Sequence, residues 1–281
     1  MAILGTRPHY GPSTVSVVPN LAASGPLLWM PGLDQGWDPQ GLGVVDGNLL
    51  VSAYQSNRLG ANRGPCRVFR LDPATGRESG HFDIPSPCGH AGGLADAGDG
   101  TLYIADTHTL FEVDLDRAFG NRAIQFRNFP LGAGLKGAFA ASGRREIWIG
   151  TYEEDRPGRM FKYDRRILMA LSDGAMLTRG LAAAELVIPS YAQGAAVSSG
   201  NLWISRSELA WGFLEKLDLA AGRVVERYSV TGGVEGIAFD VDGGLWGVSE
   251  AGARHFPLYY PFFPLIFRLD LDRMKPAASY R

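Results

Sequence analysis

The sequence lacks an excess of charge of either sign. Its 27 Lys and Arg residues nearly balance its 29 Asp and Glu residues, which leaves a formal net charge of -2 over 281 residues. Nucleic acids and anionic membrane surfaces are bound through strongly basic patches, and this composition does not indicate one. We therefore expect no nucleic-acid partner and no attachment to an acidic membrane surface.

Long apolar runs are also missing. A membrane-spanning helix needs about 18 or more apolar residues, and the most apolar stretch, 256–267, is interrupted by Pro257, Pro261 and Pro264. We expect a loop there and no membrane insertion. The first eight residues are too short and too broken for a secretory signal, which predicts a cytoplasmic chain unless such a signal has been trimmed.

Three kinds of active-site motif are absent. There is no Gly-x-Ser-x-Gly nucleophile elbow, no phosphate-binding glycine-rich loop and no pair of Cys or His residues at zinc-ligand spacing. A catalytic site, if the chain has one, must therefore be assembled by the fold from residues that are far apart in the sequence.

An internal repeat is present instead. Five segments share a glycine, two or three small or apolar residues, a turn and then an apolar or aromatic run, and each is followed by two further strand-like segments. The repeat lengths of roughly 42 to 57 residues are close to those of propeller blades. A glycine permits close backbone approach where the innermost strands crowd a central axis. The five equivalent glycines are Gly41, Gly93, Gly137, Gly194 and Gly236.

Four short strands per unit predict an all-β fold, a five-bladed β-propeller in one domain over residues 1–281, with six blades as the alternative. The last unit lacks a fourth strand, and we expect segment 26–31 from the N-terminus to supply it and close the ring, which removes exposed strand edges. A short helix is expected at 167–171. The blades are expected at about 40–86, 90–130, 136–188, 193–231 and 235–272.

The predicted loops differ between the two ends of the propeller. Connections from the first to the second strand of a unit are short, such as Asp46-Gly47, whereas those from the second to the third strand are long, such as 152–159 and 250–264. Because elaborated loops on a rigid scaffold usually carry function, we expect the site at the end with the long loops.

Both cysteines belong to this end. Cys66 begins a third strand and Cys88 follows the fourth strand that pairs with it, so antiparallel pairing brings the two residues close together. We expect a disulfide, with two buried free thiols as the alternative. A disulfide would favour an oxidising, extracytoplasmic compartment.

Polar residues precede the repeat glycines and end the second strands, so we expect them to converge at the mouth of the channel. Converging carboxylates raise one another's pKa and are typical of functional sites, although each single residue can also serve to hold blades together. The catalytic candidates are Glu235, Glu250, Asp106, His90, His108, Lys136 and Arg206. The ligand-binding candidates are Gln40, Tyr54, Tyr152, Glu153, Gln193, Glu208 and His255.

The run Glu-Gly-Ile-Ala-Phe-Asp at 235–240, followed by Asp-Gly-Gly-Leu-Trp at 242–246, resembles the strand pairs of NHL-repeat propellers and of the senescence-marker-protein, gluconolactonase and paraoxonase group. This resemblance implies a calcium-dependent hydrolase of lactones or esters, in which Glu235 matches the family's glutamate and Asp106 is a further candidate ligand. The chain departs from the family in having five units and in carrying Lys136, whose ammonium opposes a calcium ion.

Three functions follow as hypotheses. The first is a small-molecule hydrolase or lyase of lactonase or esterase type, in which carboxylates act as acid and base and Lys136 or Arg206 stabilises negative charge. The second is a non-catalytic propeller that binds a small molecule or a protein. The third is a five-bladed glycosidase, because Trp37-Asp38-Pro39 resembles the Asp-Pro opening of furanosidase propellers.

Overall fold

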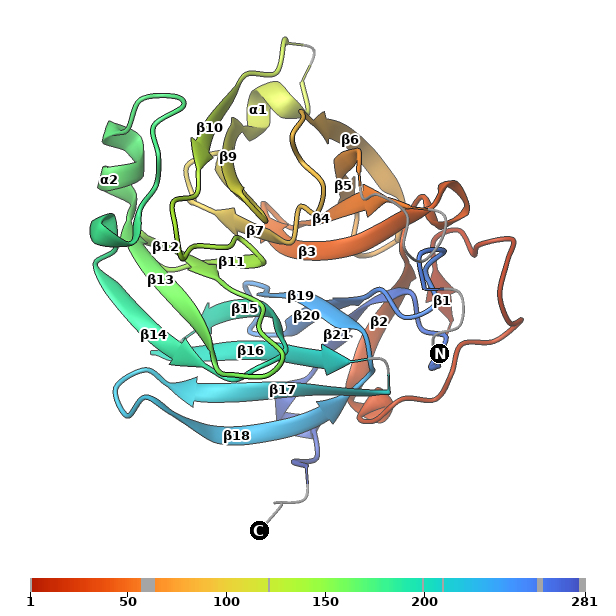
Figure 1. Ribbon diagram of the computed structural model, residues 1–281. Helices are drawn as coiled ribbons and strands as arrows, with labels where there is room; N and C mark the ends of the chain where they lie inside the picture. The colour runs from red at the N-terminus through yellow and green to blue at the C-terminus, as the bar shows by residue number, and fades with distance from the viewer. Residues whose placement is uncertain are drawn as a thin grey trace.

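The computed structural model describes residues 2–56, 64–120, 122–198, 200–208, 210–256 and 260–277. Within these ranges the chain forms five sheets arranged around a central axis, which confirms the five-bladed propeller (Figure 1). In every sheet the strand nearest the axis comes from a repeat unit that the sequence predicts. The innermost strands are β3, β7, β11, β15 and β19.

Four sheets are antiparallel meanders of four strands in chain order. The first contains β3 (Trp37–Val45), β4 (Asn48–Gln55), β5 (Cys66–Leu71) and β6 (Glu78–Ile84). The second contains β7 (Gly93–Asp96), β8 (Thr101–Asp106), β9 (Thr109–Asp114) and β10 (Phe126–Pro130). The third contains β11 (Phe139–Ser142), β12 (Glu146–Gly150), β13 (Gly158–Asp164) and β14 (Ala184–Ile188). The fourth contains β15 (Ala192–Ser198), β16 (Asn201–Glu208), β17 (Trp211–Asp218) and β18 (Arg223–Val230).

The fifth sheet joins the two ends of the chain, as the sequence predicts. Leu27 pairs with Phe267 across an antiparallel ladder, so an N-terminal strand becomes the fourth strand of the last blade. A short N-terminal strand, which the sequence did not indicate, pairs in parallel with this fourth strand and becomes the fifth strand of the sheet. In Figure 1 the red N-terminal strands lie beside the blue C-terminal ones. The sheet contains β19 (Val234–Phe239), β20 (Leu245–Ser249), β21 (Leu265–Leu269), β2 (Ser24–Trp29) and β1 (Ile3–Leu4).

Helices are few and short. The segment expected at 167–171 forms α2 (Arg165–Ala170) at the outer edge of the third blade, and α1 (Leu115–Ala118) follows β9. Asp164 caps α2 by accepting a hydrogen bond from the backbone N–H of Arg166. Among the described helices, no helix has the length and apolar character that crossing a membrane requires. Single 3-10 turns lie at Leu21–Ala23, Leu33–Gln35, Arg179–Leu181 and Leu271–Arg273.

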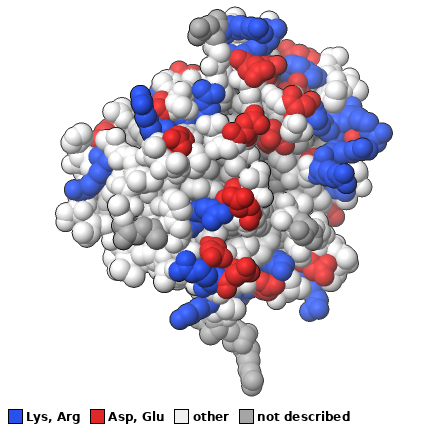
Figure 2. Space-filling view, turned by 180° about the vertical axis from the view of Figure 1, so that it is seen from behind, with Lys and Arg blue, Asp and Glu red and all other residues white. Residues whose placement is uncertain are grey.

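The hydrophobic core is divided between neighbouring blades. Leu50 and Val68 of the first blade, for example, pack in one cluster with Leu94 and Ile104 of the second. Because each second strand is covered on both sides, its sequence is continuously apolar rather than alternating. On the face shown in Figure 2, acidic and basic side chains are interspersed, with apolar and uncharged surface between them.

Close backbone approach at the axis explains the repeat glycines. A Cβ at Gly41 would lie 2.8 Å from the Cα of Gly93 in the next blade, and one at Gly194 would lie 3.0 Å from the Cα of Gly236. Ser52 reinforces the first junction, because its hydroxyl accepts from the N–H of Gly41 and donates to the carbonyl of Ala91 at 2.6 Å. Gly41, Gly93, Gly194 and Gly236 therefore let adjacent inner strands close the ring. Gly137 differs, because it precedes β11 and a Cβ there would meet the carbonyl of Asp106.

Candidate functional site

A cavity of about 510 Å³ opens at the end of the channel where the long loops lie. The start of each inner strand and the loops after the second strands contribute to its wall, so all five blades take part. Among the described residues, the lining consists of Gln40, His90, Thr107, His108, Lys136, Ala138, Tyr152, Glu154, Gln193, Ser207, Glu208, Glu235, Glu250 and Phe256. We call this space the mouth cavity.

The mouth cavity is acidic, because four glutamates face a single lysine among the residues that line it. The Tyr152 hydroxyl donates to Glu154 Oε1 at 3.2 Å. Burial raises the pKa of Tyr152, and the nearby carboxylates of Glu154, Glu208 and Glu235 raise it further. Tyr152 is therefore a protonated donor at neutral pH and does not serve as a base.

Two of these glutamates are held deep in the wall. Glu250 is 6% exposed, and its Oε2 accepts from the amide of Gln40 at 3.0 Å. Gln40 is fixed in turn because the same amide nitrogen donates to the carbonyl of Pro39 at 2.8 Å. Glu235 is 3% exposed, and the Ser205 hydroxyl donates to its main-chain carbonyl at 2.6 Å. Both carboxyl groups thus sit on rigid strand ends.

His90 reaches the cavity from a short loop that precedes β7. Asp106, at the end of β8, orders this loop because its Oδ1 accepts from the backbone N–H groups of Gly89, His90 and Ala91 at 3.1, 2.6 and 2.9 Å. Asp106 is 4% exposed and is not among the residues that line the cavity. Its described contacts are those of an anchor for the His90 loop, and its predicted catalytic role has no support from its position.

Arg206 also lies outside the cavity lining. Its Nη1 donates to Glu215 Oε1 at 2.7 Å and its Nε donates to the carbonyl of Ser190 at 2.6 Å. Glu215 is fully buried and receives a second hydrogen bond from Arg227 at 2.6 Å. The side chain that the sequence placed at the mouth therefore points along the fourth sheet, where it neutralises a buried carboxylate.

Three other predicted ligand-binding residues, Tyr54, His255 and Glu153, do not line the cavity. Tyr54 is fully buried, with its ring 5.6 Å from that of His255, whose Nδ1 lies 2.7 Å from the Ser56 hydroxyl. Glu153 is not among the lining residues and pairs with Arg156, which lowers the pKa of Glu153. These contacts support the wall, and the structure does not bring these three residues into the cavity lining.

The remaining lining residues were only partly predictable from the sequence. Glu154 occupies the position predicted for Glu153, an error of one residue in an irregular loop where alternation does not hold. Phe256 belongs to the aromatic segment 255–264, of which residues 257–259 lie outside the described ranges. Thr107, Ala138 and Ser207 adjoin predicted site residues but carry no chemical signature of their own.

A calcium ion needs about six to eight oxygen ligands. Among the described residues, only Cys66, Cys88 and Asp106 place three atoms of the metal-binding type within 4.8 Å of one another. Cys66 and Cys88 form a disulfide, so their sulfurs are not thiolate ligands. The described carboxylates at the mouth form no such group, and the structure gives Asp106 loop contacts instead, so the residues present do not fit a calcium site built on Glu235 and Asp106.

The expected disulfide between Cys66 and Cys88 is present, with Cα atoms 5.9 Å apart. It ties the His90 loop to the start of β5. Because the bridge closes a 22-residue separation, the Cys66→Ala, Cys88→Ala double variant is expected to lose about 3 kcal/mol of unfolding free energy. Urea titration would measure this loss, and reductant added to the unmodified protein should reproduce it. Equal stability of all three samples would contradict the prediction.

Comparisons with known proteins show the fold alone. No family model matches the chain, and neither does any curated protein. Among solved structures, the glutaminyl cyclase of Myxococcus xanthus is similar over 87% of this chain and 93% of its own, with a TM-score of 0.56 and 14% identity. A GH43_1 enzyme from Xanthomonas citri is similar over 87% and 88%, with a TM-score of 0.52 and 14% identity. The RS223 β-xylosidase is similar over 88% and 97%, with a TM-score of 0.51 and 13% identity.

Proposed function

We propose that the mouth cavity is the active site of a hydrolase or lyase that transforms a small polar substrate by acid–base catalysis. The observation that carries the proposal is the concentration of four glutamates, two histidines and one lysine in a single cavity of about 510 Å³. General acid–base catalysis uses these residue types, and their concentration at a channel mouth is typical of functional sites. Similarity in fold to three enzymes is compatible with this role but assigns no chemistry.

The negative charge of the wall limits the class of substrate that the cavity can accept. Four carboxylates repel an anionic ligand in a partly enclosed space, whereas a neutral or cationic ligand is accepted. Within this proposal the buried Glu235 and Glu250 donate and accept protons, and Tyr152 donates a hydrogen bond. Lys136 is the cation of the lining, so it stabilises the oxyanion that an ester or lactone would develop. No step requires a metal.

A glycosidase is the second candidate, because an acidic wall also stabilises the positive charge of an oxocarbenium-like transition state. Its carboxyl pair would be Glu235 and Glu250. The Asp-Pro opening that suggested this function contributes nothing to the cavity, since Asp38 is fully buried and is not a lining residue. The two candidate functions differ in their use of Lys136, because the ester or lactone reaction needs a cation for its oxyanion and the glycosidase reaction does not.

A panel of chromogenic esters, lactones and aryl furanosides tests both. On the panel member that is turned over, Glu235→Gln and Glu250→Gln are each expected to lower kcat/KM by about 100-fold or more, as expected for loss of an acid or base. Glu226→Gln is the matched control because this glutamate pairs with Lys216 outside the lining, and it should change kcat/KM by less than about 2-fold.

Lys136→Met then separates the candidates. We expect it to lower the kcat of an esterase or lactonase by about 100-fold, as for a lost oxyanion donor, and to leave the kcat of a glycosidase nearly unchanged. Activity that survives both glutamate substitutions would overturn the proposed site. Absence of turnover together with saturable ligand binding would instead support the non-catalytic propeller.

A further inference from the structure

A second cavity, of about 500 Å³, lies at the third blade beside the mouth cavity. Its wall comes from the connection into β11, the loop between β12 and β13, and the long connection between β13 and β14. The two cavities adjoin at Lys136, which lines both of them. We call the second cavity the side pocket. The charged residues among those that line it are Lys136, Glu153, Arg156, Arg159 and Arg179.

The side pocket is basic, because four cations face one carboxylate in its lining. Glu153 accepts from Arg156 Nε at 3.1 Å. This hydrogen bond and, less strongly, the charge of Lys136 lower the pKa of Glu153. One carboxylate is therefore shared by two cations. The other acidic residues of the same loop do not add to it, since Glu154 lines the mouth cavity and Asp155 is not a lining residue of the side pocket.

The other two cations also share one carboxylate. Glu185, which stands outside the lining, pairs with Arg159 and accepts from Arg179 Nη2 at 2.7 Å. Arg159 and Glu185 are diagonal neighbours on β13 and β14, because Arg159 pairs with Val187 and Phe161 pairs with Glu185. Counted with Glu185, four cations against two carboxylates leave two positive charges unbalanced.

Arg179 is brought to the pocket by the long connection between β13 and β14, which carries α2 and departs from the repeat (Figure 1). The N–H of Gly132 donates to the carbonyl of Leu177 at 2.8 Å and holds this connection against the segment that leads into β11. The Arg179 guanidinium lies 5.4 Å from the centre of the Phe161 ring. A Cβ at Gly134, whose φ is 80°, would lie 3.2 Å from Arg179 Cδ. These contacts place the cation before any ligand binds.

The cations keep hydrogen-bond donors for a ligand. Among the hydrogen bonds of the described residues, the side chain of Arg156 donates only through Nε, that of Arg159 through Nη1 and that of Arg179 through Nη2. A guanidinium has five N–H donors, so each arginine has several left. The Thr151 hydroxyl oxygen accepts from the backbone N–H of Arg159 at 3.0 Å, and its own proton is a further donor in the lining. The pocket therefore suits a ligand group that only accepts.

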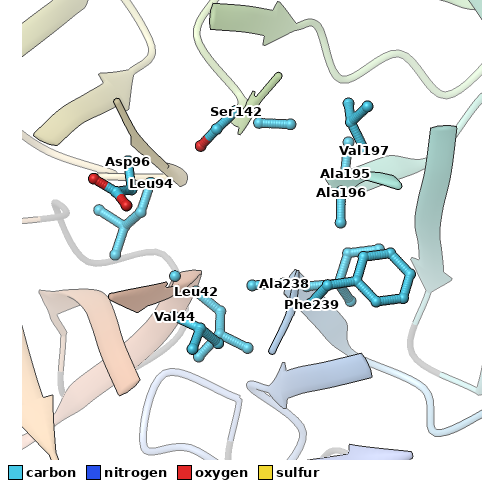
Figure 3. Close-up of a pocket in the computed structure, with 13 residues that line it drawn as sticks. Leu42, Val44, Leu94, Asp96, Ser142, Ala195, Ala196, Val197, Ala238 and Phe239 are labelled. Atoms are coloured by element: carbon cyan, nitrogen blue, oxygen red, sulfur yellow. The ribbon is translucent and has the colours of Figure 1, made fainter. Parts of the chain in front are cut away.

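The two ends of the channel do not have this charge. The mouth cavity has four glutamates and one lysine in its described lining. At the opposite end, shown in Figure 3, Asp96 is the one charged residue among the described residues that line the cavity. An anion is repelled at both ends and attracted at the side pocket.

We propose that the side pocket binds a phosphate dianion, either free phosphate or the phosphate group of a small ester, through Arg156, Arg159 and Arg179. A dianion balances the two positive charges in excess, and planar guanidinium groups match the oxygens of a phosphate. This site is independent of the function proposed for the mouth cavity.

Isothermal titration of the full chain with inorganic phosphate at about pH 8, where the dianion predominates, tests the proposal at an ionic strength held constant with sodium chloride. Dimethyl phosphate is the matched probe, because it is a tetrahedral anion with one charge fewer. We expect it to bind at least about 10-fold more weakly. Phenyl phosphate distinguishes the two sources: tighter binding than that of inorganic phosphate would identify an ester as the ligand, and weaker binding would identify free phosphate.

Two pairs of variants locate the bound phosphate. Val187 is exposed and lies directly opposite Arg159, so Val187→Glu adds a carboxylate to the lining without removing a cation. It should weaken phosphate binding at least about 10-fold, whereas Val187→Gln should change it by less than about 2-fold. Arg159→Gln should weaken binding about 10-fold. Its control is Arg166→Gln, because Arg166 pairs with Asp164 at the other end of β13, and this change should have less than about a 2-fold effect.

Melting temperatures close to that of the unmodified protein would verify that these variants fold. Loss of phosphate binding in Val187→Glu and Arg159→Gln, with binding retained in both controls, supports the side pocket. Phosphate binding that persists in Val187→Glu and Arg159→Gln would place the anion elsewhere and overturn the proposal. Equal affinities for phosphate and dimethyl phosphate, or no binding of phosphate or phenyl phosphate, would overturn it as well.

Discussion

Replacing Asp106 with alanine is expected to lower the free energy of unfolding by about 4 kcal/mol, because three backbone N–H groups lose a charged acceptor at once. The Oδ1 atom of Asp106 accepts from Gly89, His90 and Ala91, and the last of these N–H groups is buried. Ala91 has a φ of 51°, a left-handed conformation that costs energy for a residue with a Cβ. The carboxylate therefore holds the His90 loop in a shape that it would not keep alone.

Chemical denaturation of the Asp106→Ala variant measures this effect. Asp83→Ala is the matched control, since Asp83 makes an exposed ion pair with Arg67 and should cost less than about 1 kcal/mol. Asp106→Asn retains one acceptor oxygen, so its loss of unfolding free energy should lie between those of Asp106→Ala and Asp83→Ala. If Asp106→Ala were as stable as the control, the carboxylate would not anchor the loop, and its predicted role as a catalytic group would regain support.

The five-bladed fold could be predicted from the sequence because the same packing constraints recur from blade to blade. Close approach of inner strands requires a glycine in four of the five blades, and sandwiched second strands require continuous apolar runs such as Leu202-Trp203-Ile204. Ring closure followed from the same repeat, since the last unit was one strand short and segment 26–31 matched the missing strand. The extra N-terminal strand at Ile3–Leu4 was not predictable, because two residues carry no period.

The end of the propeller that carries the mouth cavity could be predicted, but the orientation of individual side chains could not. Glu235 and Gln40 precede repeat glycines, so their place at the axis follows from the register of the inner strands. Arg206 lies on a second strand, where its direction depends on a partner, Glu215, that is recognisable only from cross-strand contacts. Glu153 and Glu154 belong to a loop without regular alternation, so the sequence could not tell which of them faces the cavity.

The repeat glycines supply the second large expected effect. Replacing Gly93 with alanine should destabilise the protein by about 3 kcal/mol or more, because a Cβ there would overlap the backbone nitrogen of Ala140 in the neighbouring blade. The obstacle is backbone, which cannot rotate away as a side chain can. Relief would require the second and third blades to separate, and that movement would expose apolar surface between them.

Gly43→Ala is the matched control for this substitution. A Cβ at Gly43 would meet only Leu94 side-chain atoms, the nearest at 3.6 Å, which is ordinary packing distance. Its backbone φ is not in the left-handed region, so we expect a change within about 0.5 kcal/mol, with mild stabilisation from reduced unfolded-state entropy. Thermal and urea unfolding of both variants measure the difference. Equal stability of the two variants would mean that the inner strands do not approach as closely as the ring requires, and the structural reason for the repeat glycines would then fail.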